Sequence, residues 1–158
     1  MKTSTYILLV SIVVIFCGCT SSPDADNLIN TKASLPSSFN FNSLGLKVMA
    51  SFVNKSQASM STLYGNSIAL ETSKKNNGKT QPGEFFALIT WKQQADKNWF
   101  GANIPGELQS VELLRISTTN IINYMRYKGA SLVLDTDNTL IPKKRIAFIL
   151  SQQPSVMP

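Results

Sequence analysis

Both cysteines of the 158-residue chain, Cys17 and Cys19, lie near its amino terminus, and the chain contains no histidine. The rest of the chain must therefore fold by apolar packing, without an internal disulfide. Most transition-metal sites use imidazole or thiolate ligands, and most nucleophilic triads need a histidine base. These chemistries are largely excluded. We expect no metal site, no catalytic residues and no cofactor.

The segment before the cysteines is typical of a secretory signal peptide. Lys2 supplies a positive start, and residues 7–16 form an apolar run interrupted only by Ser11. A membrane-spanning helix needs about 20 apolar residues, so this run is too short to cross a bilayer. Its length fits the apolar core of a signal peptide, with an uncleaved anchor helix as the alternative.

The residues that end this run, Phe16-Cys17-Gly18-Cys19, resemble a bacterial lipobox. The resemblance implies cleavage after Gly18, a thioether-linked diacylglycerol on Cys19, and acylation of the new amine. Phe16 stands where leucine is usual, and Cys17 where alanine or serine is more common. At about 0.8 kcal/mol per buried methylene, two or three acyl chains would hold the protein stably on its membrane.

This interpretation divides the chain into a signal peptide (residues 1–18), a lipidated flexible tether (19–38) and one folded domain (39–158). The tether is rich in Ser, Asn, Asp and Pro, which favours a flexible segment. Thr20 follows Cys19 where inner-membrane lipoproteins of the enteric sorting pattern have Asp. That resemblance implies a bacterial cell-envelope protein, anchored in the outer membrane and facing the periplasm.

The formal net charge is +6, from 15 Lys and Arg against 9 Asp and Glu. The positive residues cluster at residues 74–79 and 143–145, which indicates a solvated surface or contact with acidic lipid headgroups. A protein located in the cell envelope is not expected to bind nucleic acid. We expect the membrane as a partner through the lipid anchor, together with a protein or small molecule that the sequence does not identify. A homodimer is an open alternative.

The pattern of apolar residues predicts an α+β domain with a mainly antiparallel β-sheet and two short helices. The first helix follows Asn66 as its N-cap and ends at Lys74-Lys75, and the second begins at Pro142. The predicted strands are residues 44–53, 59–64, 84–92, 99–102, 111–117, 121–127 and 131–135.

Two local patterns lead to narrower expectations. Residues 104–106, Ile-Pro-Gly, are expected to break the short strand at 99–102. The pattern Asp-x-Asp-Asn, which begins at Asp135 and includes Asp137, resembles the start of a calcium-binding loop, but the glycine and the terminal glutamate of such a loop are missing. We therefore predict a hairpin turn there.

Three runs, residues 59–70, 80–94 and 99–112, resemble the domain of the cytochrome P-460 family and the short lipoproteins grouped with it. In the family pattern a strand ending in Tyr-x-Asn leads into a helix, and a Pro-Gly turn leads into an apolar strand. Here Tyr64-Gly65-Asn66 and Pro82-Gly83 take those places. The resemblance implies a small, mainly antiparallel β domain that is often dimeric.

The same resemblance implies a c-type haem bound by Cys-x-x-Cys-His near the C-terminus, cross-linked to a lysine and used in hydroxylamine oxidation. Residues 141–158 contain neither cysteine nor histidine. Leu88 lies where the lysine is expected, and Lys92 is out of step with it. We therefore predict a haem-free relative, and a shared scaffold does not transfer the activity.

Two functional hypotheses follow. The first is a lipid-anchored binding or interaction module without enzymatic activity, since aromatic and arginine side chains dominate binding surfaces. The second is a haem-binding envelope redox protein, which would need an iron ligand other than histidine or cysteine. The candidate binding residues are Tyr64, Asn66, Trp99, Phe100 and Arg126.

Overall fold

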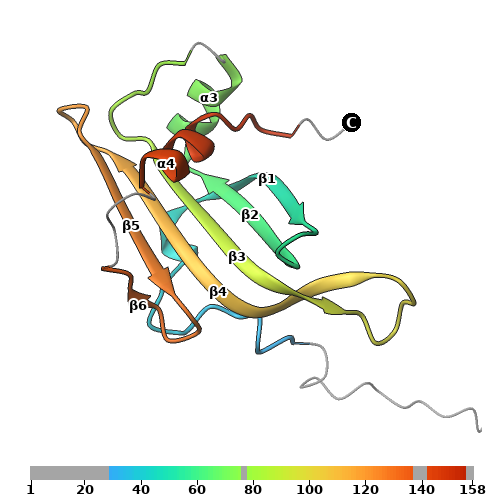
Figure 1. Ribbon diagram of the computed structural model, residues 1–158. Helices are drawn as coiled ribbons and strands as arrows, with labels where there is room; N and C mark the ends of the chain where they lie inside the picture. The colour runs from blue at the N-terminus through green and yellow to red at the C-terminus, as the bar shows by residue number, and fades with distance from the viewer. Residues whose placement is uncertain (1–28, 76–77, 137–141, 156–158) are drawn as a thin grey trace, which may run out of the picture.

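The computed structural model describes residues 29–75, 78–136 and 142–155, which form a six-stranded antiparallel sheet and two α-helices (Figure 1). The strands follow one another in the order β1-β2-β3-β4-β5-β6. The predicted α+β class with a mainly antiparallel sheet is confirmed. The elements are η1 (Asn42–Leu44), β1 (Lys47–Asn54), β2 (Ser59–Gly65), α3 (Ser67–Lys75), β3 (Phe85–Ala95), β4 (Asn103–Ile116), β5 (Ile122–Lys128), β6 (Val133–Leu134) and α4 (Pro142–Leu150).

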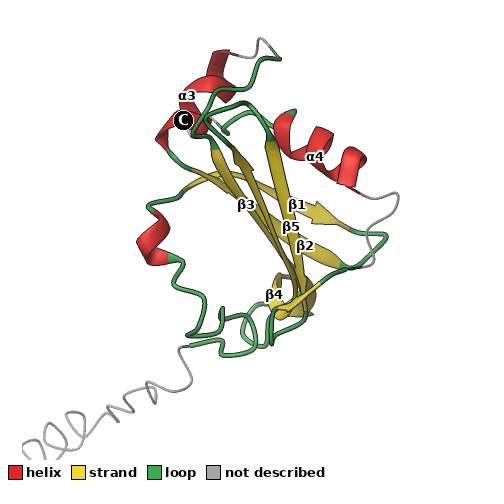
Figure 2. Ribbon diagram, turned by 90° about the vertical axis from the view of Figure 1, so that its left-hand side faces the viewer, coloured by secondary structure: helices red, strands yellow, loops and turns green. Residues whose placement is uncertain are grey.

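Both faces of the sheet carry a core, because neighbouring residues of a strand point to opposite faces. On one face Phe86 and Leu88 pack with Ile149 of α4 and Ala69 of α3. On the other face a second apolar cluster is covered by the segment before β1. α4 and η1 accordingly lie on opposite sides of the sheet (Figure 2). The second cluster consists of Ala87, Ile89, Trp91, Leu108, Val111 and Leu113, with Ala33, Leu35, Phe39 and Phe41 packed against it.

The β3–β4 hairpin differs from the prediction. Residues 99–102 form its turn instead of a strand, with Gly101 at a φ of +80°. β4 then continues through Pro105 and Gly106, with a shift in its register against β3 between Trp91 and Gln93. The prediction of a break at Pro105 was wrong. β5 pairs with β4 only from Ser110 onward, so no strand lies beside Pro105 on that side of β4. The N–H that proline lacks is therefore not required for strand pairing there.

The segment before β1 occupies part of the edge that β5 leaves open. Asn30 Nδ2 donates a hydrogen bond to the Pro105 carbonyl at 2.6 Å, and the Lys32 carbonyl accepts one from the Leu108 N–H at 3.2 Å. The end of the predicted tether therefore lies along β4. The predicted signal peptide, both cysteines and Asp137 lie outside the described residues.

The two helices begin where the sequence predicts. Asn66 Oδ1 accepts hydrogen bonds from the N–H groups of Ala69 at 3.0 Å and Phe85 at 3.3 Å, and its Nδ2 donates to the Gly83 carbonyl at 2.8 Å. Asn66 thus caps α3 and joins it to the start of β3. α4 begins at Pro142. In the described ranges no helix has the length and apolarity to cross a bilayer.

The chain returns to the first strand after α4. The Ser155 N–H donates to the Met49 carbonyl at 2.7 Å, beside the register shift between Val48 and Ala50 of β1. The last described residues therefore cover part of the outer edge of the sheet, which would otherwise expose unpaired backbone groups.

Ile149 tests how much α4 contributes to stability, because its side chain is fully buried against the sheet. We expect Ile149→Ala to lower the free energy of unfolding by about 2–4 kcal/mol through lost burial and a residual cavity. Urea denaturation measures this change. Val48→Ala, at a 60% exposed position on β1, serves as the control and should change it by less than about 0.5 kcal/mol. Equal effects of both substitutions would contradict the importance of α4 packing.

Candidate functional site

A cavity of about 710 Å³ lies between the sheet and α4, and we call it the sheet–α4 cavity. Phe52 of β1 and Phe148 of α4 contribute aromatic walls, with ring centroids 5.3 Å apart. The remaining lining is mostly polar. The polar and charged residues that line it are Asn54, Gln57, Ser59, Ser61, Thr90, Glu107, Gln109, Ser110, Glu112, Arg126, Lys128 and Arg145.

The floor of the cavity is built from two adjacent cross-strand rows. One row is polar throughout and runs from Ser61 through Thr90 and Ser110 to Lys128. Within it the hydroxyl groups of Ser61 and Thr90 are hydrogen bonded at 2.9 Å. This face of the sheet is therefore apolar beneath α3 and carries hydroxyl groups farther along the strands, toward the β3–β4 hairpin.

The other row begins apolar and ends charged: Leu63, Leu88, Glu112 and Arg126. Glu112 and Arg126 are direct cross-strand partners on β4 and β5, a position in which opposite charges stabilise a sheet. The two rows together place cationic groups along one side of the cavity, on β5.

The Glu112 carboxylate is buried, with 1% of the residue exposed, and all its hydrogen-bond partners come from α4 and β5. Oε1 accepts from Arg145 Nη2 at 2.6 Å, and Oε2 accepts from Arg145 Nε at 2.9 Å and from the Tyr124 hydroxyl at 2.6 Å. The hydrogen bonds to Glu112 raise the pKa of the Arg145 guanidinium. Burial, together with the hydrogen bond to Glu112, raises the pKa of Tyr124 well above its usual value near 10. This fork-to-fork ion pair fixes α4 over β4.

Arg126 is bound less completely than Arg145. Its Nη1 lies 3.8 Å from Asp135 Oδ2, and the same oxygen lies 2.9 Å from Lys128 Nζ. The Nε–H of Arg126 is buried and finds no acceptor within the described part of the chain. Leaving a buried donor unpaired costs about 1–3 kcal/mol. A ligand oxygen in the cavity is the kind of group that would satisfy this donor.

The described lining of the cavity contains two carboxylates and no His or Cys side chain. The described residues include no group of three or more His, Cys, Asp or Glu side chains placed to hold a metal ion. Glu112 is occupied by Arg145 and Tyr124, which leaves Glu107 as the other carboxylate of the lining. Haem iron is usually held by His, Cys, Met or Tyr, and none of these residue types lines the cavity in the described ranges. The lining therefore does not fit a haem.

The structure separates the five binding residues predicted from the sequence. Arg126 lines the sheet–α4 cavity. Tyr64 packs edge-on against Phe41 on the opposite face, with ring centroids 4.7 Å apart, and burial raises its pKa. Asn66 is the cap of α3. Trp99 and Phe100 lie at the tip of the β3–β4 hairpin, away from the other three.

Three residues that organise the cavity were not predicted from the sequence: Glu112, Tyr124 and Arg145. One signal was available: Glu112 is a lone carboxylate inside the apolar run of residues 111–114. A charge in a buried strand requires a partner, but the sequence does not say which cation folds back onto it.

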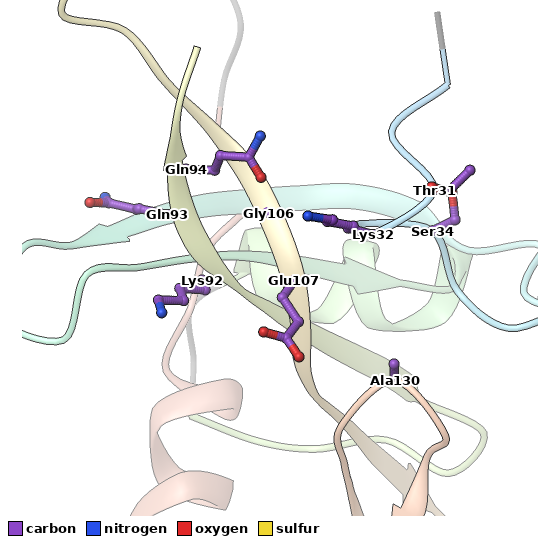
Figure 3. A pocket seen from close by; sticks show the side chains of 9 residues that line it. All are labelled: Thr31, Lys32, Ser34, Lys92, Gln93, Gln94, Gly106, Glu107 and Ala130. Atoms are coloured by element: carbon purple, nitrogen blue, oxygen red, sulfur yellow. The ribbon is translucent and has the colours of Figure 1, made fainter. Parts of the chain in front are cut away.

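A second cavity of about 580 Å³ lies beside the base of the β3–β4 hairpin, where the segment before β1 meets β4 (Figure 3). Its side chains point in several directions: on β3, Gln93 is directed away from Lys32, whereas the neighbouring Gln94 is directed to the side on which Lys32 lies. The arrangement is less organised than the sheet–α4 cavity, so it is the weaker candidate for a ligand site.

Comparison of the sequence with protein-family models gave no match, and comparison with curated proteins gave none either. The fold and the cavity define an antiparallel α+β domain with a polar cavity between its sheet and α4. The function must therefore be argued from the site itself.

Glu112→Gln tests the buried ion pair. We expect the substitution to lower the free energy of unfolding by about 3 kcal/mol, because it leaves the Arg145 guanidinium without its counter-charge. Chemical denaturation measures the change. Glu71→Gln is the matched control, since Glu71 is exposed and lies 3.9 Å from Lys74 on α3. A loss at Glu112 no larger than the loss at Glu71 would contradict the organising role of the pair.

The raised pKa of Tyr124 predicts a loss of stability in alkali. Above about pH 10 the unfolded chain releases the Tyr124 proton, whereas the folded chain keeps it, so the free energy of unfolding falls as the pH rises. Denaturation midpoints measured between about pH 9 and pH 11 should decline less steeply in Tyr124→Phe than in the wild type. Identical slopes for the two proteins would refute the prediction.

Proposed function

We propose that the protein is a lipid-anchored protein of the bacterial envelope whose domain binds a small molecule bearing an oxyanion group in the sheet–α4 cavity. The observation that carries this proposal is the buried Arg126 Nε–H, which has no acceptor in the described residues and belongs to the cavity lining. A carboxylate or phosphate oxygen would accept that hydrogen bond.

The surroundings of Arg126 suit such a ligand. Hydrogen bonds between a guanidinium and an oxyanion are short and about twice as strong as neutral ones. Asp135 Oδ2 lies 3.8 Å from Arg126 Nη1 and 2.9 Å from Lys128 Nζ, and both cationic residues line the cavity. The hydroxyl row through Thr90 and Ser110 offers further donors and acceptors to the polar remainder of the ligand.

The envelope address is supported by the sequence. A short apolar run ends at a lipobox-like Phe16-Cys17-Gly18-Cys19, and the chain then turns polar. The resemblance to the cytochrome P-460 family supports a related scaffold without its haem. The haem-binding redox alternative gains no support from the cavity, because its lining offers no usual iron ligand.

Titration of the purified chain with inorganic phosphate, succinate and a sugar phosphate, followed by calorimetry, tests the proposed ligand class. We expect at least one of these probes to bind the wild type. Arg126→Gln should weaken that binding by about 10- to 100-fold, since it removes a charge-assisted hydrogen bond in a buried site.

Arg115→Gln provides the matched control, because Arg115 lies on neighbouring β4, over the Phe85 ring, and does not belong to the cavity lining. It should leave the affinity unchanged. Binding of a neutral sugar in preference to all three anions, or equal losses in both arginine variants, would refute the oxyanion site.

A further inference from the structure

The tip of the β3–β4 hairpin exposes two adjacent aromatic side chains. Trp99 is 72% exposed and Phe100 is fully exposed. The β3–β4 hairpin projects beyond the rest of the sheet, so its tip lies away from the body of the domain (Figure 1). Two neighbouring large aromatic residues in water expose apolar surface of the kind that marks an interaction site.

The turn that carries the two aromatic residues is closed by hydrogen bonds. Asp96 Oδ1 accepts from the Asn98 N–H at 2.8 Å, the Ala102 N–H donates to the Trp99 carbonyl at 3.1 Å, and the Asp96 N–H donates to the Ala102 carbonyl at 3.0 Å. Trp99 and Phe100 are therefore held at a defined tip, next to the exposed Lys97.

The first described residues of the chain lie at the base of the same hairpin. Asn30 is hydrogen bonded to Pro105, and Lys32 lies beside Gly106 (Figure 3). Pro105 is six residues from Trp99, which corresponds to at most about 20–22 Å of extended chain. The start of the domain and the hairpin tip thus lie within a short distance of each other, at the part of the molecule away from α3 (Figures 1 and 2).

The length of chain before the domain sets how far a membrane can be from this tip. Cys19 and Ile29 are ten residues apart, so the connecting chain reaches at most about 33–36 Å. This step rests on the lipid anchor at Cys19 that forms part of the proposed function. With that anchor, the bilayer lies within reach of the hairpin tip.

We propose that the hairpin tip is a second membrane contact, at which Trp99 and Phe100 enter the boundary between headgroups and acyl chains of the bilayer that carries the anchor. Aromatic side chains favour this boundary because their rings are apolar and the Trp N–H can still be hydrated. Lys97 beside them suits acidic headgroups. One copy of the protein then touches its membrane at two places, the acylated Cys19 and the hairpin.

Tryptophan fluorescence of the full lipoprotein tests the contact. The protein is reconstituted into vesicles of phosphatidylethanolamine and phosphatidylglycerol, with and without bromine on the acyl chains as a contact quencher. The chain has two tryptophans, and Trp91 is 9% exposed with its Nε1 bonded to the Ala33 carbonyl at 2.8 Å. We expect the brominated vesicles to quench most of the Trp99 emission, which is the difference in emission between the wild type and Trp99→Gln. The remaining Trp91 emission of Trp99→Gln should be the same in both kinds of vesicle.

Two further variants define the surface. Phe100→Ser should reduce the quenching of Trp99, whereas Val133→Ser, at a 66% exposed position on β6, should not change it. If the protein floats with the vesicles but Trp99 is not quenched, the hairpin proposal is overturned. It is also overturned if the protein forms a dimer in detergent that Trp99→Gln abolishes, because the hairpin tip then contacts a second copy of the chain. Flotation distinguishes the failure of the anchor: if the wild type floats no better than Cys19→Ser, the anchor fails and the hairpin proposal fails with it. The oxyanion site is tested separately by calorimetry.

Discussion

The rest of the structure depends on the interaction of the buried Glu112 carboxylate with Arg145 and Tyr124. This carboxylate is a charge placed in the middle of a sheet, and burying such a group without partners would cost far more than a single hydrogen bond returns. Arg145 and Tyr124 satisfy it from two other elements. One group therefore ties β4 to β5 through the tyrosine and to α4 through the arginine. The position of α4, and with it one wall of the cavity, follows from this requirement.

The cavity exists because the sheet face changes character along its strands. Near α3 the face is apolar and is filled by Phe86, Leu114 and Ile149. Toward the hairpin the row through Ser61 and Thr90 replaces apolar side chains with hydroxyl groups, which α4 does not cover. Small polar side chains leave volume that large apolar ones would fill. The same sheet thus provides a core at one end and a site at the other.

Much of the fold was predictable from local sequence, whereas the site was not. Asn66 and Pro142 are strong start signals, and the structure begins both helices there. The break at Pro105 was predicted wrongly, because its tolerance depends on where β5 ends, which is a property of strand pairing and not of the local residues. Arg126 was identified as a candidate binding residue from its residue type alone. Arg126 lies close to Asp135, and Arg145 binds Glu112 from 33 residues away. Both contacts are tertiary, and no local sequence pattern predicts them.

The return of the chain from α4 to β1 has a consequence for the order of folding. The strands pair strictly with their neighbours in sequence, and short loops connect them except between β2 and β3, where α3 intervenes, so the sheet can assemble from local pairings. Closure of the apolar face is different, because Ile149 belongs to the same apolar cluster as Met49 and the Ser155 N–H donates to the Met49 carbonyl. These contacts join positions about a hundred residues apart, and contacts of such separation form late because of the loop entropy they require. The sheet can therefore form while the chain is still emerging, but its core closes only when the C-terminal segment is free to fold back, so a chain held at its C-terminus keeps one face of its sheet exposed.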